Sequence, residues 1–453
     1  MAPTTSPFID LLRGRLTDNP RELRNVLWIT IANLLYGAGA ALFAGELMQG
    51  YLTRTGFDTS EIGFLVSVVP FSNALGLLAL MGLADRVRNR IMAYVVCLML
   101  VSVPPAVIAV VALTFGETVP LPVLKIVLTT VFACQGLAAS FMFMLDYPII
   151  ARAFTVGIRG SIFGILTMTY SILAVAVGWV AAGVLKQSPY PMGYAWCFMG
   201  ASAAIMLRAA AYSRIRELPQ LAVAGSSRSV LPLAAIVDVL KMKEFQWLGP
   251  PHILRGLCGG LVALTVTMGL KELQLPEHYP GYAASTLHAA NICGGIALGL
   301  VADRWGAGRT TLVADTLVAL ALAVIMFAWR PEAFLGAYFV AAFGGAVEGS
   351  SVPLGCINIV PPDQLGAFSA ARLMVLYGAS AVGSNVFGYL FKRCTPRSVF
   401  ALGAALKFAN GLWFWYVFGL KKPVDLTRQD EEEGTSGGPP AEGDAVVADE
   451  AAD

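Results

Sequence analysis

Charge is scarce in this chain of 453 residues, of which 13% are charged and 57% are hydrophobic. A soluble globular protein carries about 25% charged residues, so the composition excludes that class and indicates a protein that lies in lipid. The net charge of +2 hides an uneven distribution of charge along the chain, so it gives no indication of a nucleic-acid partner. We therefore expect membrane lipid, and no nucleic acid, around this chain.

Patterns for metal binding and disulfides are also missing. Six of the seven cysteines fall inside apolar runs and Cys394 lies alone, so neither a disulfide framework nor a metal site is indicated. An integral-membrane enzyme would need His, Asp or Cys residues clustered at one interface, whereas His252, His278 and His288 are scattered. We expect no cofactor and no enzyme activity.

A cleavable signal peptide is not indicated at the start of the chain. The apolar stretch that begins at Pro7 is interrupted by Asp10 and Arg13 before it reaches the length of a signal core. We expect the first membrane-spanning run to direct insertion.

Long apolar runs are abundant. A helix needs about 20 apolar residues to cross about 30 Å of hydrocarbon, and twelve runs reach this length. The sequence therefore predicts an all-α membrane protein with twelve transmembrane helices. The runs lie approximately at 26–52, 60–83, 91–113, 122–146, 160–185, 193–213, 247–271, 281–302, 310–329, 333–357, 366–391 and 398–420.

Basic residues gather in the connections on one side of these runs. Such residues mark the cytoplasmic side, so both termini are predicted to be cytoplasmic. The residues on this side are Arg13, Arg15, Arg21, Arg24, Arg86, Arg88, Arg90, Arg152, Arg159, Arg214, Arg216, Arg228, Lys241, Lys243, Arg304, Arg309, Lys421, Lys422 and Arg428.

One long polar connection divides the runs six and six. Apolar residues at helical spacing over 233–245, with charges between them, predict a helix on the inner leaflet. After Pro423 the chain becomes acidic and rich in Gly, Pro and Ala, which is typical of disorder. The predicted organisation is a cytoplasmic segment 1–25, a first six-helix bundle 26–213, a cytoplasmic linker 214–246, a second six-helix bundle 247–420 and a disordered tail 421–453.

The two predicted bundles carry a repeated sequence. Residues 63–86 recur at 281–304, at a constant offset of 218, with nine of the 24 positions identical. Gly160 and Gly366 continue the repeat at an offset of 206. Repeated halves in an apolar chain are typical of transporters whose halves rock around a central site.

The repeat contains a specific loop motif. The segment 299–309, GLVADRWGAGR, resembles the motif Gly-x-Leu-Ala-Asp-Arg-x-Gly-Arg-Arg of the major facilitator superfamily. The first copy, at 81–90, has Met81 and Arg88 where the family prefers glycine. The resemblance covers about residues 25–420 and implies two pseudo-symmetric six-helix bundles that open alternately to opposite faces.

Two aspartates of this motif are candidate gating residues. A carboxylate at a helix end can accept hydrogen bonds from the free N–H groups that begin a neighbouring helix. The resemblance implies that Asp85 holds the start of the eleventh run near Gly366, and Asp303 the start of the fifth near Gly160. A plain helix-ending turn is the alternative. The residues that we assign to gating are Asp85, Arg86, Arg152, Arg159, Asp303, Arg304 and Glu46.

Two motifs of proton-coupled exporters are incomplete. Phe132 stands where the fourth run of such exporters carries arginine, and the fifth run reads Gly178-Trp179-Val180 without the Gly-Pro pair of the antiporter signature. The sequence therefore disfavours, without excluding, a proton-coupled exporter of amphipathic compounds.

Charged residues inside the runs form a candidate binding site. Each ionisable group at bilayer depth costs about 2.5 to 3.5 kcal/mol on insertion scales, so each needs a partner, water or a function. Arg255, Glu348 and Arg372 lie at similar depth, and the resemblance places their helices around a central cavity. We predict that the two arginines bracket Glu348, with His252 one turn from Arg255. One arginine would then hold an anionic group of the solute; a closed ion-pair network that keeps helices in register is the alternative.

Other polar residues in the runs extend this candidate site. Glu46, near the outer end of the first run, is either a gating or coupling residue or a solvated acid, and Lys407 is expected to snorkel or to pair. An uncharged polar residue in a run more often bonds a neighbouring helix than a ligand. The uncharged candidates for the cavity are Asn33, Tyr36, Asn73, Gln135, Tyr170, His288, Asn291, Tyr377 and Asn385.

Together these features predict a monomeric transporter in the cell membrane that works by alternating access. We expect it to move a small polar organic solute, such as an organic acid or an amino acid, by facilitated or secondary active transport. A proton or a cation is the candidate co-transported ion. A transporter-like receptor that binds a solute without moving it is a further alternative.

Overall fold

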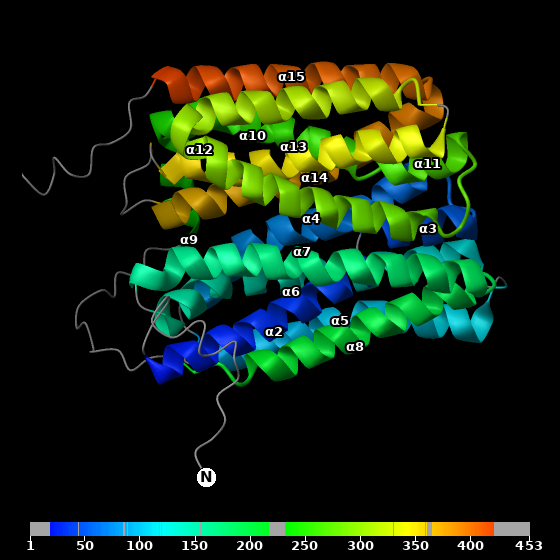
Figure 1. The fold of residues 1–453 in the computed structure, drawn as a ribbon, viewed down its shortest axis with the longest axis horizontal. Coiled ribbons are helices and arrows are strands. Elements are labelled where there is room, and N and C mark those ends of the chain that lie inside the picture. Colours follow the sequence, from blue (N-terminus) through cyan, green and yellow to red (C-terminus); the bar gives the residue numbers. More distant parts are fainter. Residues whose placement is uncertain are drawn as a thin grey trace, which may run out of the picture.

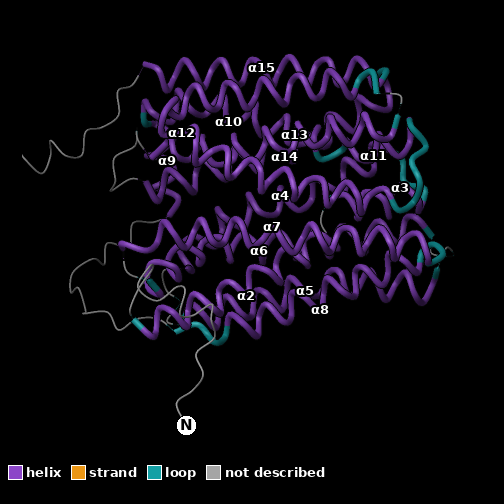
Figure 2. The backbone as a smooth tube through the Cα atoms, in the orientation of Figure 1, coloured by secondary structure: helices purple, strands orange, loops and turns teal. Residues whose placement is uncertain are grey.

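The computed structural model is a bundle of long helices that run side by side along one axis (Figure 1). Within the described residues the chain is helical, with short connections between the helices (Figure 2). The structure describes residues 19–43, 45–84, 87, 89–116, 118, 120–154, 156–216, 232–328, 330–357, 359 and 365–420, without the side chains of 81–84, 147, 148, 151, 152, 156–165, 167, 232–236, 299, 300, 302, 303, 357, 365–367 and 420.

The helices agree with the predicted all-α membrane fold. In the described ranges, ten segments are long and apolar enough to cross a membrane. The other two predicted runs, 281–302 and 398–420, coincide with the first part of α12 and with α15. The helices are α2 (Pro20–Phe43), α3 (Glu46–Thr55), α4 (Thr59–Ala84), α5 (Arg90–Phe115), α6 (Leu121–Ala153), α7 (Val156–Gln187), α8 (Met192–Tyr212), α9 (Pro232–Lys241), α10 (Lys243–Val262), α11 (Thr265–Glu272), α12 (Tyr279–Ile325), α13 (Pro331–Ile357), α14 (Leu365–Arg393) and α15 (Pro396–Leu420).

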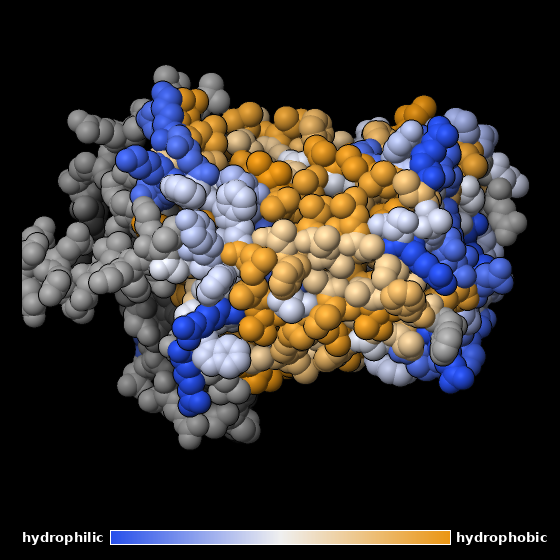
Figure 3. Space-filling model, turned by 90° about the horizontal axis from the view of Figure 1, so that it is seen from above, coloured by the Kyte–Doolittle hydropathy of each residue, from blue (hydrophilic) through white to orange (hydrophobic). Residues whose placement is uncertain are grey.

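The surface of the bundle matches a membrane setting. On the face that Figure 3 shows, apolar residues cover the middle and polar residues gather at both ends. Backbone polar groups in hydrocarbon must be satisfied within the protein, and helices satisfy theirs internally. The chain is therefore a multi-pass membrane protein.

Both halves interrupt their first helix at the same place. In the first half the interruption lies between α2 and α3, where Gly45 takes a φ of 49°, a left-handed value that glycine adopts without strain. In the second half it lies between α10 and α11, at Ala263 and Leu264. Gly45 and Ala263 are related by the offset of 218 that the sequence repeat shows. Interrupted helices in corresponding positions are typical of repeated transporter halves.

A second glycine turn divides α12. Gly306 has a φ of 74° and a ψ of 162°, so the helix changes direction there. This turn separates the runs predicted at 281–302 and 310–329, and it lies inside the loop motif at 299–309.

The predicted linker contains α9 and the beginning of α10. The seventh spanning helix starts at Lys243, before the predicted position 247, because α9 ends at Lys241 and the chain turns directly into α10. Val239 is buried in a cluster with Phe245 and Phe368, so α9 is held against α10 and α14. The segments 1–18, 217–231 and 421–453, which include most of the predicted N-terminal segment and the whole predicted tail, lie outside the described residues.

Two pairs of helices join the halves in the same way. α4 packs against α14, and α7 packs against α12. In each pair the second helix of one half meets the fifth helix of the other, so the two contacts are equivalent in the repeat. Gly63 of α4 faces the backbone of Ser384 and Gly388, and its repeat equivalent Gly281 faces Ala182 of α7. Small residues at these positions let the helix backbones approach closely.

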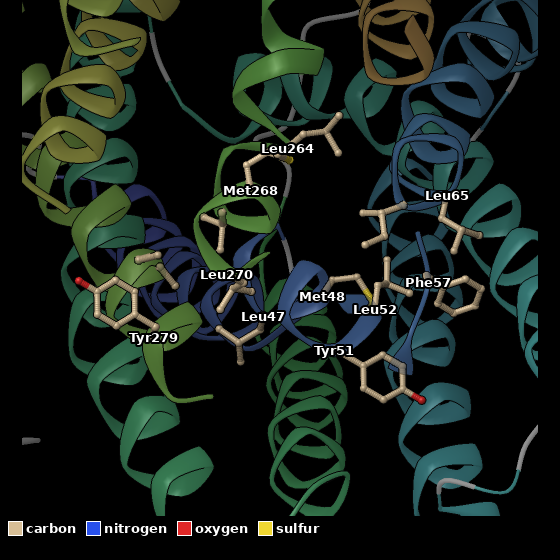
Figure 4. Close-up of a cluster of buried hydrophobic side chains, with 14 of the residues drawn as sticks. Leu47, Met48, Tyr51, Leu52, Phe57, Leu65, Leu264, Met268, Leu270 and Tyr279 are labelled. Atoms are coloured by element: carbon tan, nitrogen blue, oxygen red, sulfur yellow. The ribbon is translucent and has the colours of Figure 1, made fainter. Parts of the chain in front are cut away.

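An apolar cluster joins the halves at one end of the bundle. We call the end at which Pro20 and Leu420 lie the terminal face, and the opposite end, with α3 and α11, the distal face (Figure 1). The cluster near the distal face draws on both halves (Figure 4). Its members include Leu47, Met48, Tyr51, Leu52, Phe57 and Leu65 from the first half and Leu264, Met268, Leu270 and Tyr279 from the second.

Candidate functional site

Two carboxylates and two cations form a buried cluster in the second half. Lys407 Nζ on α15 lies 2.5 Å from Glu348 Oε2 on α13 and 2.7 Å from Asp315 Oδ1 on α12. Arg255 Nε on α10 lies 3.2 Å from Glu348 Oε1. Asn410 Nδ2 donates to Asp315 Oδ2 over 2.7 Å and to Glu348 Oε1 over 3.4 Å. We call these five residues the second-half cluster, and their formal charges cancel.

The members of this cluster differ in their exposure. Asp315 is fully buried and Glu348 and Lys407 are each 4% exposed, whereas the side chain of Arg255 is 15% exposed. Buried ionic groups are stable only while each charge keeps its partners. Arg255 is therefore the most accessible charged member of the cluster. If the Arg255 side chain moved away from Glu348, the carboxylates of Asp315 and Glu348 would have only the Lys407 ammonium as a partner.

The first half carries a corresponding polar group. Arg208 on α8 is buried, donates from Nη2 to the Tyr94 hydroxyl over 2.8 Å, and has its guanidinium carbon 4.0 Å from the ring centroid of Tyr36. Asp146 on α6 interacts electrostatically with Arg208 and accepts a hydrogen bond from Tyr94. We call Arg208, Asp146, Tyr94 and Tyr36 the first-half cluster.

The two clusters occupy equivalent helices of the repeat. Each has a carboxylate on the fourth helix of its half and a cation on the sixth. The cluster residues come from the first, third, fourth and sixth spanning helices of each half. In the first half these residues are, in that order, Tyr36, Tyr94, Asp146 and Arg208. In the second half they are Arg255, Asp315, Glu348 and Lys407. The second half thus has charged groups, Arg255 and Asp315, where the first half has two tyrosines.

Two cations of the described part of the chain lie against Glu348. Arg255 lies against it, as predicted. The other is Lys407, which pairs instead of snorkelling. Arg372 lies within electrostatic range of His252 and of Cys356.

His252 faces the interior of the second half. Its Nδ1 donates to the backbone oxygen of Leu248 over 2.7 Å, and its ring lies 5.4 Å from that of Phe414 in an edge contact. The residue is 1% exposed. His252 therefore packs beside the cluster, one turn from Arg255, and presents little surface to a solute.

Sequence reasoning missed five members of the clusters, namely Tyr94, Asp146, Arg208, Asp315 and Asn410. The three charged ones stand inside predicted runs, so the cost of an intramembrane charge was a usable signal. All three lie near the ends of their runs, where a side chain can also reach water. Sequence alone does not distinguish a charge that turns outward from one that turns into the bundle.

Aromatic side chains connect the halves. The ring centroids of Tyr36 and Tyr170 are 5.0 Å apart, and Tyr170 lies 5.2 Å from His288 on α12. Phe143 on α6 stacks on Tyr377 on α14, with centroids 6.1 Å apart and planes 18° apart. Tyr36 is 37% exposed, and Tyr170 and Tyr377 are half-buried, so these rings offer surface for a solute.

Three further uncharged candidates, Asn33, Gln135 and Asn291, differ in their hydrogen bonding and burial. Asn33 Nδ2 donates to the backbone oxygen of Leu166 and to Thr169 Oγ1, so it bonds α2 to α7. Gln135 has a buried Oε1 for which the described residues offer no hydrogen-bond donor. Asn291 is half-buried on α12. Asn33 thus has a structural partner, whereas Gln135 retains an unused acceptor.

The predicted gating residues of the loop motif fall mostly outside the described side chains. This applies to Asp85, Arg86, Arg152, Arg159 and Asp303. Arg304 is exposed on α12 next to the Gly306 turn.

Glu46 joins the two halves. It is 6% exposed at the start of α3, and its Oε1 accepts a hydrogen bond over 2.5 Å from the hydroxyl of Tyr338 on α13. The alternative of a solvated acid is therefore wrong for this conformation.

Further polar bonds cross between the halves near the distal face. Gln49 Oε1 accepts from the backbone N–H and from the hydroxyl of Thr267, each over 3.0 Å. Gln49 and Thr267 are themselves equivalent at the offset of 218. Lys271 Nζ donates to the backbone oxygen of Phe57 and to Thr59 Oγ1, each over 3.1 Å. Together with the apolar cluster, these bonds hold the halves together at the distal face.

Asp58 and Lys392 form a more exposed pair between the halves, with Oδ2 and Nζ 2.9 Å apart. Partial burial opposes ionisation of Asp58, but the Lys392 ammonium, the Ser60 hydroxyl and the Glu61 backbone N–H outweigh it and lower the pKa of Asp58. Because the pKa is lowered, the pair contributes fully above the ordinary carboxyl pKa of about 4. The contribution is lost as the pH falls through the lowered pKa.

We expect a small effect from this pair, because its side chains are 54% and 43% exposed. Lys392→Gln should weaken closure of the distal face by no more than about 1 kcal/mol at pH 7. Distances between spin labels on the two halves, recorded at pH 7 and pH 3, measure the fraction of molecules whose distal face is closed. A shift of the closed population by more than about tenfold at pH 7, which is 1.4 kcal/mol, would show that the pair is stronger than its exposure permits.

The repeated halves, the interrupted first helices and the buried charges define a membrane transporter of a known family. The sequence model of the Major Facilitator Superfamily matches residues 29–354. The chain belongs to this superfamily. No curated protein matches it.

Solved structures of transporters share the fold. The nucleoside transporter NupG is 15% identical, with a TM-score of 0.67 over 88% of this chain and 100% of its own. The xylose transporter XylE from E. coli, in a partially occluded inward-open conformation, is 13% identical, with a TM-score of 0.68 over 88% of this chain and 98% of its own. The human organic anion transporter MFSD10 is 17% identical, with a TM-score of 0.58 over 87% of this chain and 100% of its own.

Proposed function

We propose that this chain moves a small polar organic solute across the membrane by alternating access, with the solute held between the halves. One observation carries the proposal: Arg255 is the partly exposed member of a charge-balanced cluster whose other charged groups are buried. Its partial exposure leaves the guanidinium within reach of a solute, which the buried charges of the cluster are not. The repeated halves and their equivalent contacts support the rocking motion.

The proposed solute carries an anionic group. A guanidinium binds a carboxylate or phosphate through two parallel hydrogen bonds, so Arg255 suits such a group. The partly exposed rings of Tyr36, Tyr170 and Tyr377 can pack against a small organic body. The similar structures include transporters of organic anions, nucleosides and xylose, which are all small polar organic solutes.

The second-half cluster offers a route to proton coupling. When a solute anion draws Arg255 away from Glu348, Asp315 and Glu348 share Lys407 and the cluster carries one surplus negative charge. A proton on either carboxylate restores neutrality, which a buried site favours over a bare charge. Asn410 stays between the two carboxylates, and His252, Cys258 and Arg372 are the other titratable groups nearby. Solute and proton would then move in the same direction.

The contacts at the distal face support a conformation that is closed on that side. With both termini in the cytoplasm, as the basic residues predict, the distal face is the outer face. The similar structure of XylE is a partially occluded inward-open one. Glu46, Gln49 and Lys271 are the residues that we assign to the outer gate in this conformation.

Flux through purified full-length protein in proteoliposomes tests the proposal. A thermal-shift screen against a metabolite library identifies the solute, and its uptake is then followed with and without a pH gradient. We expect uptake of at least one anionic solute, stimulated when the outer side is acidic. Solute binding without flux would instead support a receptor and contradict transport.

Arg255→Gln should raise the concentration of solute that gives half-maximal uptake by tenfold or more, because a hydrogen bond to a charged group contributes about 1.5 to 3 kcal/mol. Arg330→Gln, which changes an exposed arginine near the distal face, is the matched control and should behave like wild type. If Arg255→Gln lowers the amount of folded protein and the uptake in equal measure, its role is structural.

A further inference from the structure

A cavity of about 290 Å³ lies at the terminal face of the second half. It is lined by residues of α12, α13 and α15 and by Ile359, whereas the halves pack along α4 with α14 and α7 with α12, and the bond from α13 to Glu46 lies near the distal face. Of the ten described residues that line it, four are glycines, namely Gly306, Gly308, Gly355 and Gly419, so much of this wall is bare backbone. The cavity is therefore separate from the charged clusters and from the contacts between the halves.

The mouth of this cavity is basic and aromatic. Arg309 lines it and is exposed, and Arg304, which is also exposed, precedes the lining residue Trp305 in the chain. None of the lining residues whose side chains the structure describes is acidic. Trp305 and Trp415 also line it and are 50% and 47% exposed. Half-exposed tryptophan beside arginine is typical of the level of lipid headgroups.

An apolar furrow continues from the cavity. It has a volume of about 100 Å³, and Trp305 lines both spaces. From Trp305 to Ala297 the furrow follows two helical turns, about 12 Å, toward the middle of the bundle. The other residues that line it are Val301, Thr310, Val313, Ala314, Leu317, Phe343 and Val347. A basic mouth joined to an apolar furrow matches a molecule with an anionic head and a hydrocarbon chain.

We propose that this site binds an anionic glycerophospholipid from the leaflet at the terminal face. The phosphate lies against Arg309 and Arg304, and one acyl chain follows the furrow past Trp305. Basic pockets between membrane helices on the cytoplasmic side recognise anionic headgroups in this way. The site does not depend on the proposed transport function, because none of its residues belongs to either charged cluster.

Native mass spectrometry of the full-length protein in detergent tests this proposal. Phosphatidylglycerol and phosphatidylcholine with the same acyl chains are added at equal concentration. We expect at least fivefold more retained phosphatidylglycerol than phosphatidylcholine, and loss of this preference in Arg309→Gln, since one basic residue at a membrane surface contributes roughly that factor. Arg330→Gln, on an exposed arginine near the distal face, should keep the preference, and thermal melting confirms that both variants are folded.

The furrow has its own test. Ala297→Trp should fill the furrow and remove the preference for long-chain phosphatidylglycerol over its dioctanoyl form, while dioctanoyl binding stays at the wild-type level. Inorganic phosphate alone should not displace the long-chain lipid. Displacement by phosphate would show a simple anion site and overturn the proposal. Equal retention of both lipids by the wild type, unchanged in Arg309→Gln, would show adventitious lipid only and would overturn it as well.

Discussion

Lys407→Met is expected to remove most of the folded protein from the membrane. Methionine keeps the length and the apolar stem of the side chain, so the change removes chiefly the ammonium that Asp315 and Glu348 share. Removing one partner from a buried ionic group costs about 3 to 5 kcal/mol, because the remaining charge is left uncompensated. That loss is a large part of the 5 to 15 kcal/mol by which domains are stable. Size-exclusion chromatography of detergent extracts and the melting temperature measure the loss.

A second substitution separates charge balance from packing. In Lys407→Met with Asp315→Asn the remaining charges are Glu348 and Arg255, which already pair at 3.2 Å. This double variant should recover at least half of the lost folded protein. Lys186→Met, on an exposed lysine at the end of α7, is the control and should be neutral. The single variants Lys407→Met and Asp315→Asn are measured beside it. If the double variant loses as much folded protein as the two single variants lose together, the cluster does not act as one electrostatic unit.

The cluster shows which contacts can be predicted from sequence in such a protein. The pairing of Arg255 with Glu348 followed from depth, because a helix rises 1.5 Å per residue and equal depth limits the partners available. The pairing of Lys407 with Asp315 depends on the faces that α12 and α15 turn inward. Both helices are apolar around most of their circumference, so hydrophobic periodicity does not mark the inner face.

The fold was predictable to a greater extent than the site. The length of the apolar runs predicted the helices, and the offset of 218 relates the two interruptions at Gly45 and Ala263. The short helices α3 and α11 were not predicted, because each continues an apolar run and is separated from its neighbour only by a local change of backbone angles. The bonds that α3 and α11 make across the halves were missed for the same reason.

Gly63→Leu, and equally its repeat equivalent Gly281→Leu, is expected to lower uptake at least tenfold without lowering the amount of folded protein. A Cβ at Gly63 would lie 2.5 Å from the backbone oxygen of Ser384, and one at Gly281 would lie 2.5 Å from the backbone nitrogen of Ala182. Backbone atoms cannot rotate away, so α4 and α14, or α7 and α12, must separate. A cost of 1 to 3 kcal/mol for such overpacking shifts the equilibrium between closed and open distal faces by about 5- to 150-fold.

Labelling of a buried cysteine distinguishes this explanation from misfolding. Thr267→Cys places a thiol where the wild-type residue is fully buried, in a background whose exposed Cys134, Cys293 and Cys394 are serine. A membrane-impermeant maleimide should label it faster in Gly63→Leu than in the parent. Gly183→Leu is the matched control, since nothing lies within 4 Å of a Cβ added there, and it should transport normally. Normal uptake and unchanged labelling in Gly63→Leu would mean that close approach of α4 and α14 is not part of the transport cycle. If Gly183→Leu lowers uptake as much as Gly63→Leu does, the effect comes from a leucine in a membrane helix and not from the close approach.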